Sequence, residues 1–176
     1  PAHRVTTVDT GSIPSLPGGR YGIIVSTNDK DLGDSLGVVV EQVINRRDGN
    51  RVGTSVVLGA PHNSGSTTWN VPSGITAGDD VLQVMNTTSQ EATVSVLQVG
   101  PAGAVVLGGL ESLVLQAGGV LSIGVPPGLP DAQIIVQATV TVVVQRLLLR
   151  GHGLFGRSAV LALPHLPSPQ PVESSP

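Results

Sequence analysis

The chain has 176 residues, of which 40% are hydrophobic but only 2% are aromatic, and its formal net charge is -3. The core must therefore be built from aliphatic side chains, and the negative charge excludes a general attraction to nucleic acid. Because the chain contains no cysteine, disulfides and thiolate metal sites are excluded as well.

The sequence repeats itself with a period of about one hundred residues, which is too long for a solenoid or propeller unit and fits a tandem domain. Val5 to Val25 resembles Val105 to Val125, and Val38 to Pro61 recurs as Val142 to Pro164 with a one-residue deletion. Residues 68 to 100 have no counterpart before residue 1. The sequence therefore predicts the back of one domain followed by a whole second domain.

This repeat sets the expected domain boundaries. We predict the C-terminal part of a first β-sandwich unit at 1–61, a polar linker at 62–67, a complete second unit at 68–164 and an extended Pro/Ser-rich tail at 165–176. The first unit lacks counterparts of the strands expected at 81–99. We expect it to be completed by a preceding segment, by another chain or by packing on the second unit, because an open sheet leaves backbone groups unpaired.

The first motif with chemical meaning is Asp9-Thr10-Gly11-Ser12, which matches the active-site turn of aspartic proteases. That chemistry needs two carboxylates that share a proton. The repeat aligns this motif with Gly109-Leu110-Glu111-Ser112, which lacks the aspartate, so only a homodimer could build the pair. We favour a turn between two strands.

Two further features could suggest a metal site. Asn28 to Asp34 clusters carboxylates as a calcium loop does, but no acid closes the loop at Val40, and a solvated turn is favoured. The four histidines all lie in segments flanked by glycine or proline: His3, His62, His152 and His165. None has metal-ligand spacing on one element, so we expect surface histidines and no metal or other cofactor.

Basic residues gather at two predicted hairpin tips, Arg46 to Arg51 and Arg150 to Arg157. Charge at such a tip can simply keep a hairpin soluble and guard its edges. The second tip also carries Leu154 and Phe155, and the only phenylalanine of the chain belongs in a core unless it meets a partner. We therefore predict a partner-binding site at Arg150, Leu154, Phe155 and Arg157.

The second unit shows strand patterns at short intervals, and 23 glycines and 14 prolines supply frequent turns. Residues 67–71 open the unit, and strands are expected at 81–85, 92–99, 104–107, 112–115, 120–125, 133–138, 140–149 and 158–163. This spacing predicts an all-β fold, a tandem antiparallel β-sandwich of immunoglobulin-like size, with a barrel as the alternative. Asn86-Thr87-Thr88 in one of the turns also satisfies a glycosylation sequon.

Several motifs resemble one protein family: Val38-Val39-Val40-Glu41, Gly53-Thr54-Ser55, Leu58 to Pro61, Trp69 to Thr76, and the Asn86 turn with Ala92-Thr93-Val94. The sequence is similar to an exported actinobacterial family of tandem β-rich units whose function is unknown. Gln42 stands where that family often has arginine, and Ser73 where it often has glutamate. The resemblance implies an extracytoplasmic location and supplies no catalytic residue.

The resulting hypothesis is a non-catalytic structural or interaction module of an exported cell-envelope protein. Its expected partner is an envelope protein, another copy of itself, or an anionic envelope polymer or lipid surface. The alternatives are a polymer- or carbohydrate-binding module and a dimeric aspartic protease that uses Asp9. Scarce aromatic residues weigh against the former, because sugar-binding platforms present exposed rings, and the single Asp-Thr-Gly weighs against the latter. Ile134 to Val144, the longest apolar stretch, is shorter than a membrane-spanning helix.

Overall fold

The computed structural model describes residues 5–16, 18–19, 21–26, 38–61, 63–72, 80–126, 133–149 and 157–165. Within these ranges the regular structure is antiparallel β, apart from one turn of 3-10 helix, η1 (Thr10–Ser12). The described strands form two sheets and do not close into a barrel. The predicted all-β, sandwich-like fold is therefore confirmed, and the alternative of a barrel is wrong.

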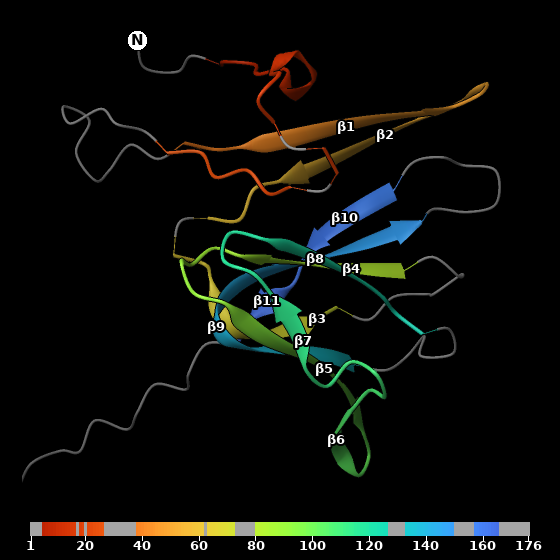
Figure 1. Ribbon diagram of the computed structural model, residues 1–176. Coiled ribbons are helices and arrows are strands. Elements are labelled where there is room, and N and C mark those ends of the chain that lie inside the picture. The colour runs from red at the N-terminus through yellow and green to blue at the C-terminus, as the bar shows by residue number, and fades with distance from the viewer. Residues whose placement is uncertain are drawn as a thin grey trace, which may run out of the picture.

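The smaller sheet is a hairpin of β1 (Glu41–Asp48) and β2 (Arg51–Leu58). All remaining described strands belong to the larger sheet (Figure 1): β3 (Ser66–Val71), β4 (Asp80–Asn86), β5 (Ala92–Gly100), β6 (Gly103–Val106), β7 (Leu113–Leu115), β8 (Val120–Gly124), β9 (Gln133–Leu149), β10 (Arg157–Leu161) and β11 (Leu163–Pro164). β3 begins at Ser66, inside the segment expected to be a linker.

β9 connects the two layers of the larger sheet. Its first half pairs with β3 and β5, and its second half pairs with β4 and β10. Opposite β3 the register jumps, because Thr68 faces Gln137 whereas Ser66 faces Val142. Such an irregularity lets a strand turn the corner between two packed sheets. The two strands expected at 133–138 and 140–149 are thus one bent strand.

The core lies between these layers and consists of aliphatic side chains packed around the indole ring of Trp69. Alternate residues point inward along β3, β4, β5 and β9. The side chains with 0% exposure include Trp69, Leu82, Val84, Val94, Val96, Val136, Val142 and Val144. Nε1 of Trp69 donates to the carbonyls of Ser66 and Val142, each at 3.0 Å. The only tryptophan therefore links β3 to β9 at the point where β9 bends.

A buried ion pair ties three strands together. Nε of Arg146 donates to the two carboxylate oxygens of Asp80 at 2.9 and 2.8 Å, and Nη2 contacts the same carboxylate. Nη1 donates to the carbonyl of Pro72, which follows β3. Both charged side chains are almost fully buried, and burial of a charge is tolerated only when it is paired and hydrogen-bonded in this way.

The sequence repeat is visible in the pairing of the two hairpins. Glu41 pairs with Leu58 in β1–β2, and their counterparts Gln145 and Leu161 pair in β9–β10. The amide of Gly59 donates to the carbonyl of Val40 at 2.8 Å, and the equivalent bond from Ala162 to Val144 measures 2.9 Å. The two hairpins are therefore equivalent residue by residue, whereas the division into two domains stays a prediction.

The segment before the first hairpin has no strand among its described residues 5–16, 18–19 and 21–26. Its counterparts in the second unit are β6, β7 and β8, which are held by β5 and β4. The repeat provides no counterpart of β4 or β5 within this sequence. The incomplete first unit stays a prediction.

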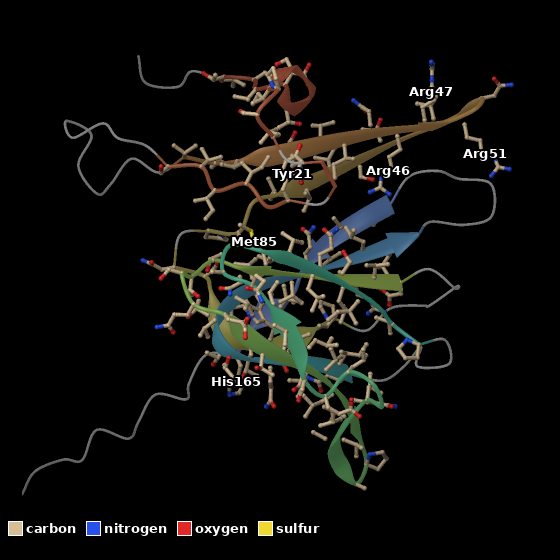
Figure 2. The ribbon with its side chains drawn as sticks, in the orientation of Figure 1. Tyr21, Arg46, Arg47, Arg51, Met85 and His165 are labelled. Atoms are coloured by element: carbon tan, nitrogen blue, oxygen red, sulfur yellow. The ribbon has the colours of Figure 1, made fainter. Side chains whose placement is uncertain are left out.

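The first hairpin forms a layer beside the larger sheet. β2 lies close to β10, and Figure 1 shows the hairpin on the side of the strands β10, β4 and β8. Leu147 of β9 points away from the core toward that side, yet only 4% of it is exposed. Met85 lies on the same side (Figure 2), and its side chain is directly against Gly22. One face of the larger sheet is thus covered by the first hairpin and by part of the segment before it.

Candidate interaction surface on the first hairpin

The two faces of the β1–β2 hairpin differ in what they meet. Ser55 is 6% exposed, and Ile44 and Val57 are half-buried, so this face is directed into the molecule. The opposite face, here called the outward face, consists of Glu41, Val43, Asn45, Arg47, Val52, Thr54, Val56 and Leu58. Strand alternation separates the two faces, because successive side chains point to opposite sides.

The outward face is apolar and exposed. Val43, Val52, Val56 and Leu58 are 52%, 62%, 51% and 63% exposed. The repeat places Leu147, which is 4% exposed, at the position of Val43. Leu147 of the second hairpin is therefore buried, whereas its counterpart Val43 in the first hairpin is exposed.

Polar groups on this face occupy defined places. Oγ1 of Thr54 donates to Oδ1 of Asn45 at 2.9 Å, which joins the two strands near the middle of the hairpin. Glu41 lies at the open end of β1, and Arg47 lies near the turn. The carboxylate and the guanidinium are thus separated by nearly the whole length of the strand.

The three arginines of the basic tip point to different sides of the hairpin. Figure 2 shows Arg46 pointing toward β10, whereas Arg47 and Arg51 extend from the far end of the hairpin. Arg46 is half-buried, and Arg47 and Arg51 are exposed. The first tip therefore presents two of its three arginines to solvent. Arg47 lies on the outward face beside the apolar stripe, whereas Arg51, which pairs with Asp48, lies on the opposite face.

The predicted partner-binding site on the second tip stays a prediction. Arg150, Leu154 and Phe155 lie outside the described residues. Arg157 begins β10 and pairs with Leu149, but its side chain also lies outside the described part of the structure.

The protease-like motif forms a self-contained turn. Oδ1 of Asp9 accepts from the amide of Gly11 at 2.9 Å, and the hydroxyl of Ser12 donates to the carbonyl of Asp9 at 2.7 Å. Asp9 thereby caps η1 and is exposed. The expectation of a turn between two strands is wrong in detail, because the described residues on either side of it are not strands.

Metal-ligating groups do not cluster in the described residues. Asn28 to Asp34 and the histidines His3, His62 and His152 lie outside those residues. The amide of His165 donates to the carbonyl of Thr68 at 2.8 Å, which extends the pairing of β3 slightly beyond β11.

The Asn86 sequon is a structural turn. Asn86 is 0% exposed, and its Nδ2 donates to the carbonyl of Gln90 at 2.6 Å. Its Oδ1 accepts from the amide of Thr88 at 2.9 Å and from the hydroxyl of the same residue at 2.8 Å. The side chain is therefore inaccessible to glycosylation in the folded protein.

Two solved structures are weakly similar to part of this chain. The crystal structure of Thermotoga maritima 1070 superposes with a TM-score of 0.42 at 18% identity, over 57% of this chain and 96% of that chain. The Anabaena sensory rhodopsin transducer gives 0.37 at 17% identity, over 49% and 90%. Neither similarity is close enough to transfer a function. No protein-family model and no curated protein matches the sequence.

Sequence reasoning selected the hairpin tips and missed the outward face beside the first of them. The signal was present in the repeat, since Val43 aligns with a leucine in an apolar run, Leu147-Leu148-Leu149. A valine that aligns with a leucine in an apolar run predicts burial, and the exposure of Val43 becomes visible only when the covering layer is known.

Proposed function

We propose that this chain is a non-catalytic structural or interaction module of an exported cell-envelope protein. The observation that carries the proposal is the outward face of the first hairpin, where four large aliphatic side chains are at least half exposed. Contiguous apolar surface on a folded protein marks a contact site more often than isolated apolar residues do. The extracytoplasmic location rests on the family resemblance of the motifs between residues 36 and 100.

The rival functions gain no support from the geometry. The only tryptophan, Trp69, is 0% exposed and cannot serve as a platform for sugar rings. Tyr21 is half-buried, and Phe155 lies outside the described residues. Asp9 uses a carboxylate oxygen to cap its own turn, which is a structural role. Among the described residues, no helix is long and apolar enough to cross a membrane.

The test compares two variants with the unaltered chain in a pull-down from envelope extract. We expect Val43→Ser with Val56→Ser to reduce capture of the bound protein at least several-fold while the circular dichroism spectrum is unchanged. The control, Val105→Ser with Val114→Ser, removes equally exposed valines from β6 and β7 and should capture normally.

A separate assay addresses catalysis. Peptide cleavage at acidic pH that pepstatin inhibits, and that disappears in Asp9→Asn, would establish the protease and overturn the proposal.

A further inference from the structure

We propose that the outward face binds the same face of a second copy of this chain, with the two hairpins packed face to face about a two-fold axis. The inference rests on the proposed function, because it names the partner of that interaction surface. Its basis is the burial of Leu147, the counterpart of Val43, and the charges of the hairpin.

The second unit indicates what kind of element covers this face. Leu147, the counterpart of Val43, is buried on the side where the β1–β2 hairpin lies against β10. On that side the larger sheet is covered by the β1–β2 hairpin beside β10 and by the segment around Gly22 against Met85, which are both elements of this chain. A second copy offers such an element, a two-stranded face with four exposed aliphatic side chains.

Charge selects between the two possible orientations. A two-fold axis parallel to the strands would bring the turns of both hairpins together, with Arg47 of one copy near Arg47 of the other. A two-fold axis across the strands reverses the partner hairpin and places Glu41 of each copy opposite Arg47 of the other. The first arrangement is repulsive and the second attractive, so the hairpins are expected to pack antiparallel.

The distance between the two charges on one strand also favours the antiparallel orientation. Glu41 and Arg47 are about 20 Å apart on one strand and cannot pair with each other. Across the proposed axis each would gain an opposite charge, and the aliphatic side chains would lie between the two ion pairs. Stable interfaces use about 20–30 residues on each side. With eight residues on the outward face, the dimer should be weak and concentration-dependent.

The experiment is sedimentation equilibrium of the whole chain over a wide concentration range. We expect a monomer–dimer equilibrium that Val43→Ser with Val56→Ser weakens at least tenfold and that Val105→Ser with Val114→Ser leaves unchanged. Glu41→Lys alone and Arg47→Glu alone should each weaken the dimer by about tenfold, since each makes two like-charge contacts. Combining Glu41→Lys with Arg47→Glu should restore it, which only the antiparallel orientation predicts.

A wild-type chain that remains monomeric, or a combined charge exchange that fails to restore the dimer, would refute this inference. The pull-down separates the two proposals. If the chain is monomeric but the Val43→Ser and Val56→Ser variant loses a different envelope protein, the second-copy inference fails and the proposed function survives. If that variant changes neither measurement, both proposals fail.

Discussion

At the scale of single residues, the Arg146–Asp80 pair should dominate the stability of the second unit. Arg146→Met removes the partner of a buried carboxylate, and we expect the free energy of unfolding to fall by about 3–5 kcal/mol. Combining it with Asp80→Val removes both charges and should recover most of the loss. Urea denaturation followed by the fluorescence of Trp69 measures both effects.

Arg51→Met is the matched control for this prediction, because Arg51 is an exposed arginine on the equivalent hairpin and lies off the outward face. Its effect should stay within about 0.5 kcal/mol. Equal losses in Arg146→Met and Arg51→Met would contradict the assigned role of the buried pair.

The ion pair also shows what could not be read from the sequence. Arg146 and Gln42 occupy equivalent places in the repeat, but nothing near Arg146 in the sequence indicates a carboxylate partner. Asp80 lies 66 positions away, and only the pairing of β4 with β9 brings them together. Trp69 was likewise recognisable as a motif residue, whereas its bonds to two carbonyls depend on the bend of β9.

At the scale of elements, the β5–β6 hairpin allows a comparison between two glycines that pair directly. Gly103 has φ of +111°, whereas Gly100 has no positive φ, and neither would bring an added methyl group within 4 Å of other atoms. Gly103→Ala should therefore destabilise the hairpin by about 1–3 kcal/mol through backbone strain alone. Gly100→Ala should have little effect.

Hydrogen exchange of the β6 amides measures this difference locally. Faster exchange is expected in Gly103→Ala and unchanged exchange in Gly100→Ala. Similar exchange in the two variants would show that backbone strain at residue 103 does not limit the hairpin.

Most strands of the second unit were predictable because apolar and polar residues alternate in them. Val94 and Val96 are buried and Thr93 and Ser95 are half-buried, as that pattern predicts. The predicted break in β9 was wrong because tertiary pairing overrides it. β3, β5, β4 and β10 together hold the strand across its polar middle, which local propensity cannot indicate.

At the scale of the whole molecule, the contact between Gly22 and Met85 should hold the first unit against the second. A methyl group at residue 22 would lie 3.1 Å from Cγ of Met85 and closer still to its sulfur and terminal methyl. Because the sulfur and terminal methyl are the flexible end of the side chain, Met85 can rotate aside, and Gly22→Ala should loosen the N-terminal layer by no more than about 1 kcal/mol. Proteolysis within residues 5–61 should become faster.

Met85→Ala removes the atoms that the new methyl group would meet. The double variant Gly22→Ala with Met85→Ala should therefore be less destabilised than the sum of the two single variants. Gly18→Ala is the control, because nothing lies within 4 Å of a Cβ at that position. Simple additivity in the double variant would show that the two residues do not touch in solution.

The first hairpin covers one face of the larger sheet, while its own outward face stays exposed. The two ends of this layered arrangement therefore differ. Each added unit of the same kind would hide the bare face of its neighbour and expose a new one, so lengthening moves the bare face without removing it. The exposed face at the end of such a series can be covered by a cap of different chemistry or by the identical face of a second copy. A two-fold contact is self-limiting, and it would turn a series of repeats with unlike ends into a closed particle with two like ends.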